Sequence, residues 1–198
     1  SANPTPGVTR DWQHVNSLDY NEELDHVAIN AKHFSEFYVI DHGATFIPGD
    51  PEKSRKLSVG KKGDFLYRFG NPSAYQQGDA PSFGNHGHSQ MYGSHNIQWI
   101  PETYWEGGPA VPGAGNFLIF SNHCYTPLTD VGSIILEIDP YAGAAAAPAR
   151  QSTYVNPPDA GYDRNDVSNQ VVWSYRSVMP HSFFSTYISG MTRMPNGN

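Results

Sequence analysis

NIQWIP at residues 96–101 is the first of four short apolar segments, and it is followed by NFLIFSN (116–122), SIILEID (133–139) and VVWSYRS (171–177). Each segment is rich in β-branched and aromatic residues, and turn signals containing glycine, proline or asparagine separate the segments. No stretch of the chain has the sustained period of an amphipathic helix. The sequence therefore predicts an all-β fold.

An earlier set of four segments repeats this order. The predicted strands lie at His14–Tyr20, Val27–Ala31, Phe37–Ile40 and Phe65–Phe69 in the first set, and at Ile97–Ile100, Phe117–Phe120, Ile134–Ile138 and Val171–Tyr175 in the second. Four-stranded units that repeat along a chain are typical of β-propeller blades, which surround a central channel. We interpret residues 1–198 as a partial β-propeller domain, with a first blade at 1–72, a second at 90–177 and the first strand of a third at 183–198.

Two and a fraction blades cannot close a ring, because propellers have roughly four to eight blades. We therefore expect other polypeptide to complete the propeller. A self-contained sandwich of about eight or nine strands also fits the length of the chain.

Composition and charge exclude several classes of partner. Twelve Lys and Arg against 19 Asp and Glu give a net charge of −7, and no basic run could follow a phosphate backbone, so nucleic acid is not expected as a partner. No apolar run is long enough to span a membrane. Cys124 is the single cysteine, which excludes a disulfide within the chain and a zinc site built on cysteines.

The predicted blades bring separated polar residues to one place. The first strand of every blade lines the channel, so His14, Asn16 and His95 are expected to face the same cavity. Lys32 and His33 follow the second strand, whose end lies at the same rim. A neutral imidazole is a nucleophile, and a nearby cation or amide stabilises charge that develops on a transferred group. This pattern favours an anionic substrate.

Other residues have more than one interpretation. Trp12, Tyr92 and Trp99 can flank a ligand or pack within the blades, and Arg193 can face the channel. His86 and His88 form an H-x-H motif that could hold copper or zinc together with His95. No carboxylate or cysteine accompanies them in that segment, and histidines in a glycine-rich loop are commonly solvated. We therefore expect neither a metal nor a cofactor.

Several segments carry a resemblance to a known family. They are DWQHVNSLDYNEELDHVAINAKHFSEFYVIDH (11–42), GDFLYRFGNP (63–72), YGSHNIQWIP (92–101), GAGNFLIFSN (113–122) and YISGMTRMPNGN (187–198). In this order they resemble the bacterial arylsulfate sulfotransferases, including the secreted, uncharacterised branch of that family. The resemblance implies a six-bladed propeller in the periplasm or outside the cell. It also implies transfer of a sulfuryl group from an aryl sulfate to a phenol, through a sulfated histidine and without a nucleotide donor.

The resemblance assigns roles to particular residues. It makes His95 the nucleophile and places the family's H-x-N on His14 and Asn16. Lys32 stands where active members have an arginine. Lysine keeps the positive charge but cannot form the planar, bidentate hydrogen bonds that a guanidinium makes to sulfate oxygens. A further family histidine belongs to a blade that these residues do not include. His33, Arg193 and Trp12 are the candidate substrate-binding residues, and a non-catalytic extracellular propeller with a binding or structural role is the alternative function.

Overall fold

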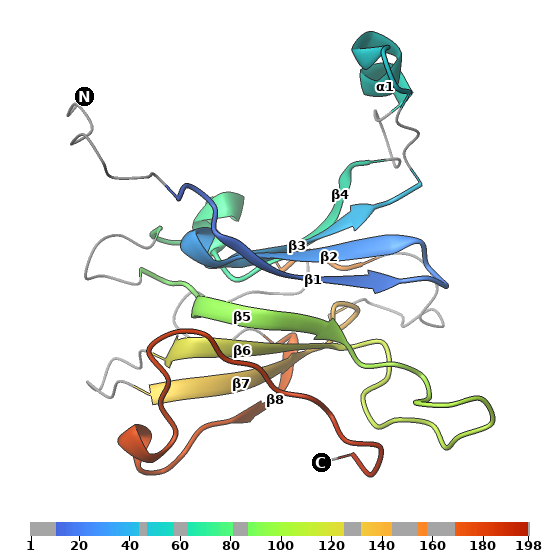
Figure 1. Ribbon diagram of the computed structural model, residues 1–198. Helices are drawn as coiled ribbons and strands as arrows, with labels where there is room; N and C mark the ends of the chain where they lie inside the picture. The colour runs from blue at the N-terminus through green and yellow to red at the C-terminus, as the bar shows by residue number, and fades with distance from the viewer. Residues whose placement is uncertain are drawn as a thin grey trace.

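The computed structural model confirms the all-β class. It describes residues 11–43, 47–57, 63–80, 87–124, 132–143, 154–157 and 169–197, and within them it contains two four-stranded antiparallel sheets and little helix. The two sheets lie one above the other, with β1 and β5 side by side (Figure 1).

The strands in each sheet follow one another in chain order. The first sheet consists of β1 (Val15–Asn21), β2 (His26–Ala31), β3 (Glu36–Asp41) and β4 (Phe65–Phe69). The second consists of β5 (Tyr92–Trp99), β6 (Phe117–Cys124), β7 (Gly132–Ile138) and β8 (Val171–Tyr175). All eight strands predicted from the apolar segments are present, with ends that differ by a few residues.

Four short helices complete the described elements: η1 (Lys32–Phe34), α1 (Pro51–Leu57), η2 (Pro72–Tyr75) and η3 (Pro180–Ser182). The side chain of Asp50 accepts the N–H of Lys53 at 2.8 Å, which provides an N-terminal cap for α1. None of the described helices has the length and apolar composition that a membrane crossing requires.

The core lies between the facing surfaces of the two sheets. In β3, Phe37 and Val39 are two residues apart, so both point toward the second sheet and both are fully buried. The ring of Phe37 lies 4.9 Å from that of Phe117, and the ring of Phe117 lies 4.7 Å from that of Trp99. These aromatic contacts join the two sheets into one hydrophobic core.

A polar seam joins β1 to β5 along one edge of this core. Both are edge strands of their sheets, and an edge strand leaves backbone N–H groups without a ladder partner. The hydroxyl of Ser17 accepts the N–H of Ile97 at 3.0 Å, and a carboxylate oxygen of Asp19 accepts the N–H of Trp99 at 2.7 Å. Side chains of β1 therefore bind the exposed edge of β5 and fix the two strands beside each other.

The structure does not form the strand expected at residues 183–198: the described residues 183–197 contain no strand. Instead, this segment runs alongside the second sheet. The side chain of Asn96 accepts the backbone N–H of Met191 at 2.8 Å. The side chain of Gln98 donates to the backbone carbonyl of Met191 at 2.9 Å. A strand requires a hydrogen-bonded neighbour. Here side chains of β5 bind the backbone of this segment in place of a neighbouring strand.

Candidate functional site

His95 lies on β5 next to a local irregularity of the strand. The pairing with β6 shifts between His95 and Gln98, and the intervening Asn96 has a φ of 57°. Such bulges re-aim side chains relative to a regular strand. The side chain of His95 is 8% exposed and forms part of a cavity wall.

The hydrogen bonds of His95 determine which ring nitrogen carries the proton. Its Nδ1 lies 2.6 Å from Oδ1 of Asn122 and 2.9 Å from the carbonyl of Gly93. The Asn122 amide is oriented by its own Nδ2, which donates to the carbonyl of Ser185 at 2.9 Å. Both partners of Nδ1 are acceptors, so Nδ1 must be the donor. In the neutral ring, Nε2 therefore keeps its lone pair.

The surroundings of His95 also keep the ring neutral. Burial lowers the pKa of His95 below its ordinary value of 6.5, and this is the largest effect. The bonds to Asn122 and Gly93 oppose the lowering, whereas the positive charges of Lys32 and His14 add to it. At neutral pH the side chain is therefore an uncharged imidazole, which is the nucleophilic form.

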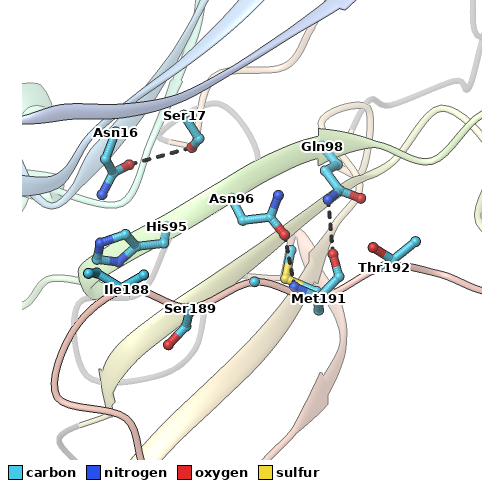
Figure 2. A pocket seen from close by; sticks show the side chains of 10 residues that line it. Asn16, Ser17, His95, Asn96, Gln98, Ile188, Ser189, Met191 and Thr192 are labelled. Carbon is cyan, nitrogen blue, oxygen red and sulfur yellow. Dashed lines mark hydrogen bonds between the residues drawn. The ribbon is translucent and has the colours of Figure 1, made fainter.

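A cavity of about 620 Å³ lies beside His95, between β1, β5 and the segment that follows η3 (Figure 2). Its walls carry mainly amide and hydroxyl groups, with two apolar side chains. The lining residues are Asn16, Ser17, His95, Asn96, Gln98, Ile188, Ser189, Gly190, Met191 and Thr192. The size falls within the usual range for a small-molecule site, roughly 300–1,000 Å³.

Asn16 lines this cavity, but its amide is held by neighbouring groups. Its Nδ2 donates to the carbonyl of Ser94 at 2.8 Å, and its Oδ1 accepts from Nδ2 of Asn30 at 2.7 Å. Asn30 is fully buried and also donates to the carbonyl of Ser94 at 2.7 Å. These bonds place the beginning of β1 directly against Ser94, the residue that precedes His95.

A second group of polar residues forms where β2 ends. The N–H groups of Lys32 and His33 donate to the carbonyls of His14 and Gln13 at 3.2 and 3.1 Å. These bonds hold η1 against the chain just before β1. The ring of His33 lies 4.9 Å from the ring of His14, and His14 forms an ion pair with Asp11. His14, Lys32 and His33 therefore lie together, and Asp11 is a further member of this group that the sequence did not predict. None of the four lines the His95 cavity, so the expectation that His14 faces the same cavity as Asn16 and His95 is not met.

Two other candidates lie away from His95. Trp12 is 72% exposed and makes an edge contact with Phe34 at 5.4 Å, and it is not among the residues of the cavity wall. Arg193 forms an ion pair with Glu137, which is 6% exposed, and lines a second cavity of about 550 Å³. This cavity adjoins the His95 cavity, because Gln98 and Thr192 line both. The structure therefore separates Trp12 and Arg193 from the lining of the His95 cavity.

The remaining aromatic and histidine candidates have other contacts. Trp99 packs against Phe117 in the core, and the ring of Tyr92 contacts that of His123 at 5.9 Å. His86 lies outside the described residues. His88 accepts the N–H of Asp79 on its Nδ1 at 2.9 Å. Neither Tyr92, Trp99 nor His88 is part of the cavity lining.

No protein-family model, curated protein or solved structure matches this chain.

Proposed function

We propose that this protein is part of a secreted or periplasmic β-propeller that transfers a sulfuryl group from an aryl sulfate to a phenolic acceptor, with His95 as the nucleophile. One observation carries the proposal. The Nδ1–H of His95 is bound by Asn122 and Gly93, which leaves Nε2 as the basic nitrogen of a ring beside a cavity of substrate size.

The order of the strands supports the propeller interpretation over a Greek-key sandwich. Each sheet is a simple meander whose four strands lie in chain order, as in propeller blades, whereas many sandwiches use crossed connections. The first strands of the two sheets, β1 and β5, lie side by side, and they carry Asn16 and His95, which line one cavity. A channel shared by successive blades requires their first strands to be neighbours, as β1 and β5 are.

The proposed reaction is a double displacement. Nε2 of His95 attacks sulfur, an N–S bond forms, and the bond from sulfur to the aryl oxygen breaks, so that the phenolate leaves with the bonding pair. The hydroxyl oxygen of an acceptor phenol then attacks the same sulfur and its proton passes to water. The N–S bond breaks and its electron pair returns to Nε2.

The hydrogen bonds of His95 suit both half-reactions. The ring gains positive charge when Nε2 binds sulfur, and the Nδ1–H bonds to Asn122 and Gly93 become stronger as that charge develops. Preorganised acceptors of this kind stabilise the charged ring without reorientation in the transition state. Asn122 thus takes the role of the group that orients a catalytic histidine.

Lys32 and His14 provide the electrostatic setting for the anionic donor. The charges of both lower the pKa of His95. The Lys32 ammonium would attract the sulfuryl oxygens as a point charge. Asn16, whose amide binds Ser94 and Asn30, would shape the cavity wall and hold β1 in place.

A non-catalytic binding role is the second candidate, and the composition of the cavity favours it. Among the residues that the structure describes, no Phe, Tyr or Trp lines the His95 cavity to stack against an aryl group. Lys32 also lacks the bidentate grip that a guanidinium would offer to a sulfuryl group. A propeller of this kind would bind a polar ligand between its first strands without forming a covalent intermediate.

Intact-mass measurement separates the two candidates. The protein is incubated with 4-nitrophenyl sulfate, and the mass is recorded while the release of nitrophenolate is followed by absorbance. We expect one added SO₃ group, located on His95 by fragmentation and absent in His95→Gln. His42→Gln alters an exposed histidine that pairs with Asp25 and should keep the adduct. If the unaltered protein shows no adduct and releases no nitrophenolate, the result favours the binding role.

A further inference from the structure

Three metal-binding side chains meet at the rim formed by η1 and the residues before β1. A carboxylate oxygen of Asp11 and one ring nitrogen each of His14 and His33 lie within 4.8 Å of one another. Around tetrahedral zinc, nitrogen and oxygen ligands at 2.0–2.2 Å from the ion lie about 3.3 Å apart. Asp11 and His33 are exposed, so small side-chain rotations would bring the three atoms to this spacing.

The backbone already positions His33 as a metal ligand. Its Nδ1 lies 2.7 Å from the carbonyl oxygen of Asp11, which can only accept a hydrogen bond, so Nδ1 is the protonated nitrogen. Nε2 therefore carries the lone pair that a metal takes. Histidine ligands commonly donate their second N–H to a backbone carbonyl or a carboxylate in this way, because the bond fixes both tautomer and ring orientation.

His14 completes the group from the other side. Its Nδ1 faces the Asp11 carboxylate, and its ring lies 4.9 Å from the ring of His33 at an interplanar angle of 35°. The backbone bonds from Lys32 and His33 to His14 and Gln13 hold the two segments together. The three ligands thus come from two chain segments that the fold fixes independently of any ion.

We propose that Asp11, His14 and His33 bind a first-row divalent metal ion, with Zn²⁺ as the best match. Two imidazoles and one carboxylate suit zinc and its neighbours, whereas calcium and magnesium prefer sites built entirely from oxygen. Only one of the three ligands is negatively charged, so the dissociation constant should lie in the micromolar range. Solvent takes the remaining position, because two of the three ligands are exposed.

This inference goes beyond the proposed sulfuryl transfer. Metal binding is measured with no sulfate ester present, so the transfer reaction can fail while the metal site stands, and the reverse also holds. If both are correct, the ion adds a second positive charge on the rim that carries Lys32.

Calorimetric titration of the apoprotein with Zn²⁺ tests the site, and the visible absorption of added Co²⁺ reports the coordination geometry. We expect one equivalent of Zn²⁺ to bind, with a tetrahedral or five-coordinate Co²⁺ spectrum. His33→Gln and Asp11→Asn should each weaken binding at least tenfold. Both residues are exposed, so circular dichroism should show unchanged folding in these variants.

Two control variants determine whether the assignment holds. His42→Gln alters an exposed histidine that pairs with a carboxylate but has no third ligand among the described residues, and it should leave the affinity unchanged. His88→Gln alters the H-x-H segment. The proposal is overturned if Zn²⁺ does not bind, if His33→Gln and Asp11→Asn bind it like the unaltered protein, or if His88→Gln abolishes binding instead.

Discussion

Oδ1 of Asn122 on β6 lies 2.6 Å from Nδ1 of His95 on the neighbouring strand β5. Asn122 is fully buried, and its Nδ2 donates to Ser185 and Ser189, at 2.9 and 3.1 Å, in the segment that closes the cavity. One amide therefore does two things. It fixes the tautomer of the candidate nucleophile, and it anchors the chain that forms the opposite wall.

Replacement of Asn122 by alanine should impair the reactivity of His95. Loss of the 2.6 Å bond leaves only Gly93 to orient the ring, and the stabilisation of positive charge on the sulfated ring weakens. We expect the rate of nitrophenolate release from 4-nitrophenyl sulfate to fall about a hundredfold, in line with the loss of one preorganised transition-state interaction. Nitrogen-detected NMR of the His95 ring should show a mixture of tautomers.

Ser189→Ala is the matched control for this variant. It removes one acceptor of the Asn122 amide but leaves the bond to His95 in place. The rate should stay within a few fold of the unaltered protein. Equal losses in the two variants would mean that Asn122 acts through the closing segment rather than through His95.

The pKa of His95 should rise when Lys32 is replaced by glutamine. The Lys32 charge is one of the causes that lower the pKa of His95 below 6.5, so its removal favours the protonated ring. The variant should show a higher pKa in an NMR titration of the His95 ring, and the acidic limb of the activity profile should move to higher pH. Lys53→Gln, in α1, serves as a charge-matched control. An unchanged His95 pKa in Lys32→Gln would place the ammonium out of electrostatic range.

The strands could be predicted because each carries its own local signal. Phe117 to Phe120 and Ile134 to Ile138 are short β-branched or aromatic runs between turn residues, and both became strands. The segment after η3 contains a comparable apolar signal at Tyr187 and Ile188 but forms no strand. Its backbone is bound by side chains of β5, a tertiary effect that a local pattern does not contain.

The candidate site was predictable only where strand geometry sufficed. Asn16 and His95 come from the first strands of two repeated units, and both line the cavity. His14 stands just before β1 and lies with Asp11 and His33, outside that lining. Asn122 lies near the far end of a neighbouring strand, so only the pairing register of β5 with β6 brings it to His95. Asp11 was missed although it stands three residues before His14, because a carboxylate near a histidine is common on protein surfaces.

The stability of the fold should decrease as the pH falls below about 6.5. Burial is the largest cause that lowers the pKa of His26, His95 and His123. Below pH 6.5 the unfolded chain therefore binds more protons than the folded chain. The contribution of these histidines to the free energy of unfolding is complete above pH 6.5, and it is lost as the pH falls toward their lowered pKa values. Urea unfolding between about pH 7.5 and 5.5 measures this slope.

His26→Gln should reduce that slope, because one of the three histidines with a lowered pKa no longer titrates. His181→Gln, an exposed histidine in η3, should leave the slope unchanged. A free energy of unfolding that is constant across this range would show that the three rings are as accessible to protons in the folded state as in the unfolded state.

The buried amide of Asn30 should be the most sensitive point of the seam between the sheets. Its Nδ2 donates to Oδ1 of Asn16 and to the carbonyl of Ser94, and its Oδ1 accepts the hydroxyl of Ser94. Asn30→Asp keeps the size but places a carboxylate oxygen against two acceptors. Since unsatisfied buried groups cost about 1–3 kcal/mol each, and more when charged, we expect a loss of at least 3 kcal/mol in the free energy of unfolding at neutral pH.

Asn21→Asp is the same substitution at the end of β1, where the retained oxygen can still accept the N–H of Leu24. It should change the free energy of unfolding by less than about 0.5 kcal/mol, as is usual for surface positions. Acid should partly restore the stability of Asn30→Asp relative to Asn21→Asp, because a protonated carboxyl group can donate to Ser94 or Asn16. Equal unfolding energies for the two variants would mean that β1 and β5 are held together by the aromatic core alone.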